Sequence, residues 1–185
     1  MKVTDTPLPG LRVIELDSFG DARGFFMELF RDRRYLDAGI DLPFVQDNFS
    51  HSVKDTLRGL HFQEPYPQGK LVQVLQGTVF DVAVDIRRGS PTFGRWFGLE
   101  LSSESKQQLW IPPGFAHGFC VTSASADFFY KCTEYYVPEA DRVLAWNDPA
   151  IGIGWPIQTP LLSKKDAAAP RLSDAPVLPS FTPGK

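Results

Sequence analysis

The sequence predicts an all-β protein, an antiparallel sandwich or barrel of many short strands with a few short helices. Glycine and proline are both frequent, with 15 and 16 copies among 185 residues, and they are scattered so that turns recur at short intervals. Short stretches that alternate apolar and polar residues outnumber stretches with a helical period. The length fits a single domain, which we place at residues 1–166.

The clearest strand covers residues 78–86, where apolar side chains occupy every second position from Phe80 to Ile86. Asp81 and Asp85 lie between them in the chain and therefore share the opposite face of the strand. Carboxylates on a strand usually meet solvent, so we expect a solvated acidic face, with a polar cavity as the alternative.

The other elements follow from the same patterns. We expect extended segments at residues 11–16, 25–30, 44–50, 57–63, 70–76, 95–101, 127–136 and 142–146. A polar loop is expected at residues 17–24, a short helix at 32–38 that ends at Gly39, and turns at a sheet rim at 109–119. The tail, residues 167–185, is rich in alanine, proline and serine, which predicts poor order or packing on the surface.

Composition excludes several classes of protein. The formal net charge of −3 argues against a nucleic-acid partner, which would require clustered excess lysine and arginine. Cys120 and Cys132 are expected as buried free thiols, because the sequence has no Cys/His cluster with zinc spacing. The N-terminal residues lack the apolar segment of a signal peptide, and no apolar run approaches the roughly 20 residues that span a bilayer. We therefore expect a cytoplasmic protein with no membrane partner.

The segment LRGLHFQ, residues 57–63, places Arg58 and His61 close in sequence to Lys70. A histidine can take and return a proton near neutral pH, and a lysine ammonium can stabilise an oxyanion. The alternative is a histidine whose hydrogen bonds are satisfied inside a β core. Strict alternation would put Arg58 and His61 on opposite faces, so both can reach one ligand only if the strand bulges, with Gly59 as the candidate position.

The segment Pro112-x-Gly114-x-x-His117 resembles the second sequence motif of the cupin superfamily of small barrels. This resemblance implies a cupin-type double-stranded β-helix, also called a jelly-roll barrel. A metal-dependent cupin would carry a His-x-His pair, whereas His61 is followed two residues later by a glutamine. Two histidines without a clear set of three ligands make a poor iron or manganese site, so we expect no metal and no other cofactor.

Nine short motifs run in order across most of the chain. They are Asp21-x-Arg23-Gly24-x-Phe26, Gln46-Asp47-Asn48-x-Ser50, Arg58-Gly59-Leu60-His61-x-Gln63, Gln68-Gly69-Lys70-Leu71-Val72, Asp81-Val82-x-Val84-Asp85-x-Arg87, Ile111-Pro112-x-Gly114-Phe115-Ala116-His117-Gly118-Phe119, Tyr130-Lys131-x-Thr133-x-Tyr135-Tyr136, Trp146-x-Asp148-Pro149, and Ser163-x-Lys165-Asp166. Together they resemble one branch of that superfamily, the dTDP-4-dehydrorhamnose 3,5-epimerases or a close group of nucleotide-sugar epimerases.

The resemblance implies cofactor-independent epimerisation at C3 and C5 of dTDP-4-dehydro-6-deoxy-D-glucose, giving dTDP-4-dehydro-L-rhamnose. Protons beside a ketone are acidic, so this chemistry needs a base on one face, an acid on the other, and a group that stabilises the enolate oxygen. By resemblance, His61 is the base and Asp166 orients and charges it, Tyr130 is the acid, Lys70 stabilises the oxyanion, and His117 is a nearby polar contact. On residue type alone, Asp166 could instead be a surface carboxylate and Tyr130 a core aromatic.

The resemblance also assigns a set of residues to substrate binding. Arg23, Arg58 and Lys165 would neutralise a diphosphate, the arginines in bidentate fashion. The family carries glutamate where this chain has Asp141. The complete expected set is Arg23, Glu28, Gln46, Asp47, Asn48, Arg58, His117, Tyr136, Asp141 and Lys165.

Several alternatives remain open from the sequence. A mono-epimerase or a ketoisomerase of a related nucleotide-linked deoxysugar would share most of these motifs, and a non-catalytic sugar-binding cupin is the rival of a different class. The presence of His61, Tyr130 and Asp166 together argues against mere binding, because a binding protein needs no acid and base. The family also implies a homodimer whose N-terminal strands cross between subunits, and a role in dTDP-rhamnose biosynthesis for lipopolysaccharide or other cell-surface polysaccharides.

Overall fold

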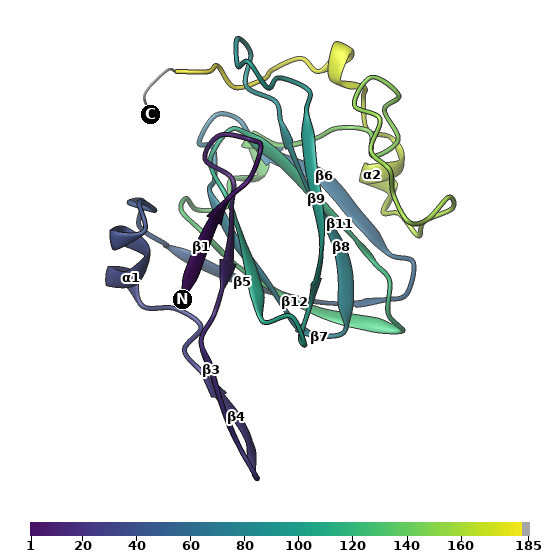
Figure 1. Cartoon of the computed structure of the whole chain (residues 1–185). Coiled ribbons are helices and arrows are strands. Elements are labelled where there is room, and N and C mark those ends of the chain that lie inside the picture. Colours follow the sequence, from purple (N-terminus) through teal and green to yellow (C-terminus); the bar gives the residue numbers. More distant parts are fainter. Residues whose placement is uncertain (183–185) are drawn as a thin grey trace.

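The computed structural model describes residues 1–182 and consists mainly of two antiparallel sheets that face each other (Figure 1). The six-stranded sheet has the order β1 (Lys2–Asp5), β2 (Arg12–Glu15), β10 (Gln107–Ile111), β7 (Lys70–Gln76), β12 (Ser125–Cys132) and β5 (Gln46–Val53). The five-stranded sheet has the order β13 (Asp141–Val143), β6 (Leu57–Gln63), β11 (Phe115–Val121), β8 (Thr78–Asp85) and β9 (Trp96–Ser102). The predicted all-β architecture is confirmed.

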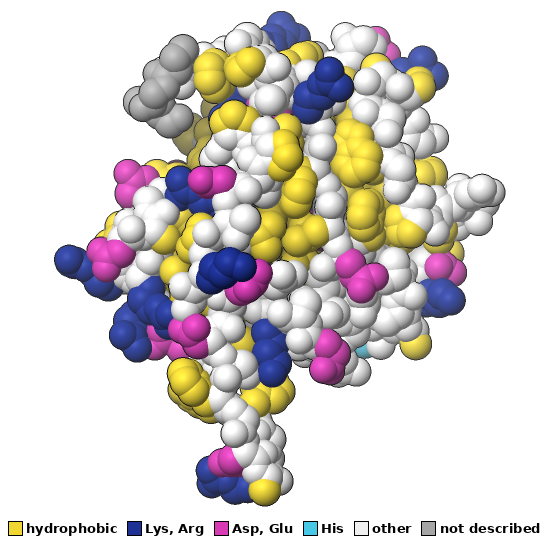
Figure 2. Space-filling view, in the orientation of Figure 1, with side chains coloured by type: hydrophobic (Ala, Val, Ile, Leu, Met, Phe, Trp, Pro, Cys, Tyr) yellow, Lys and Arg dark blue, Asp and Glu magenta, His cyan; other side chains and the backbone are white. Residues whose placement is uncertain are grey.

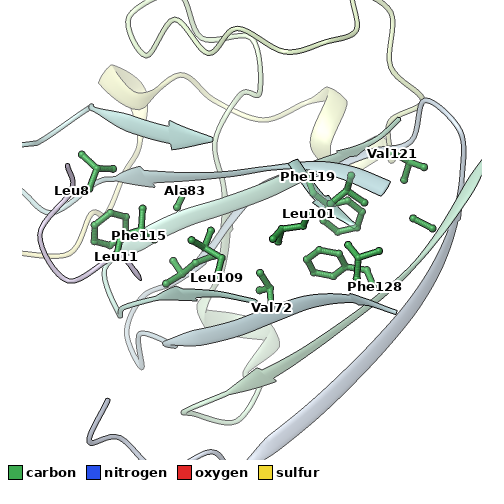
Figure 3. Close-up of a cluster of buried hydrophobic side chains, with 14 residues drawn as sticks. Leu8, Leu11, Val72, Ala83, Leu101, Leu109, Phe115, Phe119, Val121 and Phe128 are labelled. Atoms are coloured by element: carbon green, nitrogen blue, oxygen red, sulfur yellow. The ribbon is translucent and has the colours of Figure 1, made fainter. Parts of the chain in front are cut away.

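The main hydrophobic core lies between the two sheets (Figure 3). Phe119 on β11 and Phe128 on β12 stack across it, with ring centroids 4.1 Å apart and an interplanar angle of 13°. Burial of a phenylalanine side chain contributes about 2–3 kcal/mol to the free energy of unfolding, so this contact helps to hold the two sheets together. The fourteen buried residues of this core are Leu8, Leu11, Val72, Val74, Val79, Ala83, Leu101, Leu109, Ile111, Phe115, Phe119, Val121, Ala126 and Phe128.

Strand β8 has the alternation that the sequence predicts, but its acidic face is not solvated. Asp81 and Asp85 are fully buried, on the face that carries Val79 and Ala83 into the core between the sheets. The apolar face packs instead under the C-terminal part of the chain, in a second cluster that includes Val82 and Leu172. The expectation of a solvated acidic face is therefore wrong, because the outer face of the sheet is covered and its inner face holds the polar groups.

A hairpin replaces the loop expected at residues 17–24. Strands β3 (Ser18–Asp21) and β4 (Gly24–Met27) pair antiparallel and project from the body of the molecule (Figure 1). The expectation of a loop is wrong because Ser18 pairs with Met27 and Phe19 with Phe26, a pairing that the glycines and charged residues conceal in the sequence. The side chain of Phe26 is 69% exposed, and Figure 2 shows hydrophobic side chains along this arm.

The short helix is confirmed as α1 (Asp32–Asp37), and the chain turns away at Gly39, whose φ of +75° suits glycine. At residues 109–119 the turn is confined to the proline and glycine positions between β10 and β11, and strands fill the rest. Cys120 and Cys132 are buried free thiols, as predicted. No helix within residues 1–182 is long and apolar enough to cross a membrane.

The C-terminal segment lies against the outer face of the five-stranded sheet (Figure 1). It contains the short elements η1 (Pro138–Ala140), α2 (Lys164–Ala167) and η2 (Leu172–Asp174). Leu172 and Ala175 are buried in the second hydrophobic cluster. The guanidinium of Arg87 lies between the rings of Phe115 and Phe181, at 4.6 and 5.1 Å from their centroids, which anchors the end of the described chain.

Candidate active site

A cavity of about 320 Å³ opens between the two sheets, and polar side chains from both sheets line it. His61 and Asp141 come from the five-stranded sheet, whereas Lys70 and Tyr130 come from the six-stranded sheet. The complete lining is Gln46, Asn48, His61, Phe62, Gln63, Gln68, Lys70, Tyr130, Cys132, Tyr136, Asp141 and Lys165. The fold therefore gathers residues that are far apart in the sequence into one concave polar site.

A bulge in β6 brings Arg58 and His61 to the same face of the sheet. His61 lies opposite His117 on β11 and Arg58 lies opposite Phe119, so three steps along β6 match two steps along β11. Because residues 117 and 119 share a face, their partners also share one, and the predicted bulge is confirmed. Gly59 is required there, since its φ is +141° and an added Cβ would lie 2.5 Å from the Cα of Gly118.

His61 and Asp166 form a hydrogen-bonded pair, with 2.6 Å between Nε2 and Oδ1. Asp166 is only 3% exposed, and Ser163 Oγ caps the short helix α2 by accepting from the Asp166 N–H. Burial alone would raise the pKa of the Asp166 carboxyl, but the interactions with His61, together with Ser163 and Lys165, outweigh it and the pKa is lowered. Asp166 is thus a buried, ionised partner of His61 and not a surface carboxylate.

Tyr130 lies on the inner face of β12 together with Phe128 and Cys132, as alternation predicts. Its side chain lines the cavity, and its hydroxyl has no hydrogen-bond partner within residues 1–182. Burial raises the pKa of Tyr130 to about 12, so the phenol keeps its proton at neutral pH. A protonated phenol without a protein partner can donate to a ligand in the cavity.

Lys70 places its ammonium at the cavity and is 9% exposed, without an ion-pair partner within the described part of the chain. Burial lowers its pKa. His117 does not line the cavity; it is buried, and its Nε2 is 2.9 Å from one oxygen of Asp81 and 3.1 Å from the other. Lys70 is therefore the group that can meet a developing oxyanion, while the imidazole Nε2 of His117 is engaged by Asp81.

Three residues at the edge of the cavity form a connected group. The Tyr136 hydroxyl donates to Asp141 Oδ2 at 3.0 Å, and the Lys165 ammonium forms an ion pair with the same oxygen. Gln46 Nε2 donates to Asn48 Oδ1 at 2.9 Å, so the two amides that alternation put on one face do face the cavity. Arg58 lines an adjoining recess of about 320 Å³ that also contains His61, Lys165 and Asp166.

Five of the ten expected substrate residues do not line this cavity: Arg58 and His117, described above, and three that lie further away. Arg23 lies at the tip of the β3–β4 hairpin, where its side chain is 90% exposed and pairs with Asp21. Glu28 pairs with Arg31 and Arg34 instead. Asp47 lies on the face of β5 opposite to Gln46 and Asn48 and pairs with Lys131 at 2.6 Å. The chain alone therefore assembles only part of the predicted set.

Comparison with known proteins identifies the family of the chain. Residues 5–174 match the sequence profile of the family described as dTDP-4-dehydrorhamnose 3,5-epimerase. The chain belongs to this epimerase family. The predictions of the family and of an epimerase are confirmed, and so is the cupin-type barrel, the fold of the solved family members.

Relatives match the epimerase along nearly all of its length. A dTDP-4-dehydrorhamnose 3,5-epimerase of Neisseria gonorrhoeae is 59% identical over 169 residues, 91% of this chain but 52% of the relative, so the chain spans about half the length of that protein. The enzyme of Shigella flexneri is 54% identical over 177 residues, 95% of this chain and 98% of its own. A dTDP-6-deoxy-D-glucose-3,5-epimerase of Legionella pneumophila, solved with dTDP-4-keto-L-rhamnose, superposes with a TM-score of 0.95 at 55% identity and 98% coverage of both chains.

Sequence reasoning assigned no role to two residues that shape the site of the epimerase, Asp81 and Gln63. Asp81 is the buried hydrogen-bond partner of His117. Its inward orientation could be inferred only after the structure showed which face of β8 is covered by the rest of the chain. Gln63 donates to the carbonyls of Tyr66 and Tyr135 and thereby ties two loops together beside the cavity. Gln63 belongs to the motif Arg58-Gly59-Leu60-His61-x-Gln63, but the sequence analysis gave it no role. Within residues 1–182 no three His, Cys, Asp or Glu side chains are grouped as metal ligands.

Proposed function

We propose that this epimerase exchanges the protons at C3 and C5 of dTDP-4-dehydro-6-deoxy-D-glucose and releases dTDP-4-dehydro-L-rhamnose. The observation that carries the proposal is the placement of base and acid on opposite sheets. His61 reaches the cavity from the five-stranded sheet and Tyr130 from the six-stranded sheet. Epimerisation requires a proton to leave one face of a carbon and another to arrive on the opposite face.

In this mechanism His61 abstracts a proton from a carbon beside the C4 ketone. Its Nε2–H donates to Asp166, so Nδ1 is the ring nitrogen that can accept the proton, and the carboxylate stabilises the imidazolium that forms. The electron pair of the broken C–H bond moves to the ketone oxygen, where the Lys70 ammonium stabilises the enolate. Tyr130 then donates its proton to the other face of the carbon. Before the next turnover the imidazolium of His61 releases the abstracted proton to solvent, and the Tyr130 phenolate takes up a proton from solvent.

We assign the nucleotide end of the substrate to the edge of the cavity. Gln46, Asn48, Tyr136 and Asp141 offer amide, aromatic and carboxylate groups there. Arg58 and Lys165, which line the adjoining recess together, supply the positive charge that a diphosphate needs. The Lys165 ammonium pairs with Asp141 in the free chain, so a diphosphate has to compete with that carboxylate.

We further propose that the epimerase is a homodimer in which the β3–β4 hairpin reaches the cavity of the partner. The exposed Phe19, Phe25 and Phe26 of the hairpin favour burial against another surface. Arg23 and Glu28 lie outside the cavity of their own chain and would then complete that of the second copy, and we place Asp47 at the same subunit boundary. We place the enzyme in the cytoplasm and in dTDP-rhamnose synthesis for lipopolysaccharide or other cell-surface polysaccharides, with no nucleic-acid or membrane partner.

Solvent deuterium incorporation tests the reaction. Chelator-treated protein is incubated with dTDP-4-dehydro-6-deoxy-D-glucose in heavy water and followed by NMR, with His61→Asn as the inactive control. Deuterium at both C3 and C5 is the expected result. Deuterium at one carbon only would replace the proposal by a mono-epimerase, and no exchange with intact dTDP binding would replace it by a sugar-binding protein or another substrate.

Complementation tests the dimer. Arg23→Glu and His61→Asn homodimers are each expected to be nearly inactive, and mixed dimers of the two chains are expected to regain activity. In a mixed dimer one site combines the wild-type His61 of one chain with the wild-type Arg23 of the other. If Arg23 acted within its own chain, both sites of the mixed dimer would stay defective and no activity would return.

A further inference from the structure

Asp81 is a buried carboxylate with an incomplete set of partners. It lies on the inner face of β8 with no solvent exposure, and within residues 1–182 its one hydrogen-bond donor is Nε2 of His117. A charged carboxylate inside a barrel is destabilising unless a positive charge lies near it. The mechanism proposed above gives Asp81 no task.

Lys70 is the complementary case on the opposite sheet. Its ammonium is buried and has no carboxylate within ion-pair distance among the described residues. Burial lowers the pKa of Lys70, the charges of Cys132, Asp141 and Asp81 oppose this, and Lys165 adds to it. A lysine that has lost its proton could not stabilise an enolate, so the identity of its counter-charge matters for the reaction.

Two of the three candidate counter-charges are already occupied or neutral. Burial raises the pKa of the Cys132 thiol, so Cys132 carries no charge at neutral pH. Asp141 is shared between the Lys165 ammonium and the Tyr136 hydroxyl. Among residues 1–182, this leaves Asp81 as the negative charge that no other cation neutralises.

His117 holds the carboxylate of Asp81 without cancelling its charge. Burial lowers the pKa of its imidazole, so the ring is neutral and donates Nε2–H to the carboxylate. His117 also lies directly opposite His61, so two His–Asp pairs stand side by side on β11 and β6. Of these four residues, His61 alone lines the cavity as found among residues 1–182.

We propose that Asp81 is a positioning residue that, held by His117, acts as the counter-charge that keeps Lys70 protonated inside the barrel. The importance of this for turnover rests on the role assigned to Lys70 in the proposed function. The His61–Asp166 pair moves the proton, and the His117–Asp81 pair maintains the positive charge of Lys70, which stabilises the enolate.

The test compares Asp81→Asn with Asp85→Asn, a matched variant at a second buried aspartate on the same face of β8, one that pairs with Arg87. The Cε signal of Lys70 is followed against pH by NMR in lysine-labelled protein, with Lys70→Met to assign it. In Asp81→Asn the titration of Lys70 is expected to move to lower pH. The value of kcat is expected to fall about tenfold, and the alkaline limb of the profile of kcat against pH is expected to move to lower pH as well. In Asp85→Asn the Lys70 titration is expected to stay in place.

An unchanged Lys70 titration in folded Asp81→Asn would overturn the proposal. If that variant does not fold, His117→Asn is measured instead, because it keeps the Asp81 carboxylate and offers that carboxylate an N–H donor. The pKa of Lys70 is then expected not to decrease. A decrease would overturn the proposal. The titration needs no substrate. A shift of the Lys70 signal without a change in kcat would therefore contradict the role of Lys70 in the proposed function and leave the counter-charge established.

Discussion

Nε2 of His61 lies 2.6 Å from Oδ1 of Asp166, although 105 residues separate them in the chain. The segment before Asp166 is fastened to the start of β6 by two backbone hydrogen bonds, from Leu57 N–H to the Leu161 carbonyl at 3.0 Å and from Leu161 N–H to the Asp55 carbonyl at 2.8 Å. Ser163 then starts helix α2 and directs Asp166 inward. A late segment of the chain thus completes a site that an early strand begins.

Replacement of Asp166 by asparagine tests this pair. The amide keeps the shape of the carboxyl group but removes the charge that stabilises the imidazolium of His61, so kcat is expected to fall about 10²- to 10⁴-fold. Binding of dTDP, measured by calorimetry, is expected to stay unchanged. Asp174→Asn, at an exposed carboxylate of the same segment, is the control and should keep full activity. Wild-type turnover in Asp166→Asn would contradict the role of the pair.

Tyr130→Phe separates proton removal from proton return. His61 remains able to abstract a proton, so solvent deuterium is expected to enter the substrate while formation of the epimer falls at least about 100-fold. Because the pKa of Tyr130 is raised to about 12, loss of its proton does not limit the wild-type enzyme near neutral pH. Product analysis by NMR measures both rates, and Tyr66→Phe at an exposed tyrosine is the control. An undiminished rate of epimer formation would show that another group is the acid.

The stability of the folded protein at acid pH is expected to depend on the protonation of His117. Burial lowers the pKa of the folded histidine below its ordinary value of 6.5, so below that pH the unfolded chain binds a proton that the folded chain does not. The free energy of unfolding should therefore fall as pH drops from about 7 towards 5, and it should fall less steeply in His117→Asn. Urea unfolding at several pH values measures this. Identical slopes in the wild-type protein and in His117→Asn would refute the expectation.

The bulge of β6 is expected to tolerate no side chain. In Gly59→Ala the new Cβ would lie 2.5 Å from the backbone of Gly118 at a φ of +141°, so the free energy of unfolding should drop by about 3 kcal/mol or more. Gly89→Ala is the matched control, because its φ is also positive, at +87°, but no atom of residues 1–182 lies within 4 Å of an added Cβ. It should be destabilised by only about 1 kcal/mol. Equal losses in chemical denaturation would mean that backbone conformation, and not the close strand contact, requires the glycine.

Much of the fold followed from the sequence because strand periodicity is local. Alternation correctly placed Phe128 and Tyr130 on one face of β12, and Gly39 marked the end of α1. The β3–β4 hairpin was not predicted, because glycines and charged residues interrupt its phenylalanines and such a pattern is typical of a loop. Resemblance also supplied the residues now found around the cavity, but composition and spacing alone could not have given Asp166 a partner.

What the sequence by itself determined was which side chains share a face and which family the chain belongs to, since both are properties of residues in order along the chain. Tertiary structure alone decided which face is the inside. Asp81 is buried because the C-terminal segment covers the other face of β8, and that cover comes from residues almost a hundred positions later. Asp166 meets His61 for the same reason: long-range packing, unlike alternation, depends on parts of the chain that are neighbours only after folding.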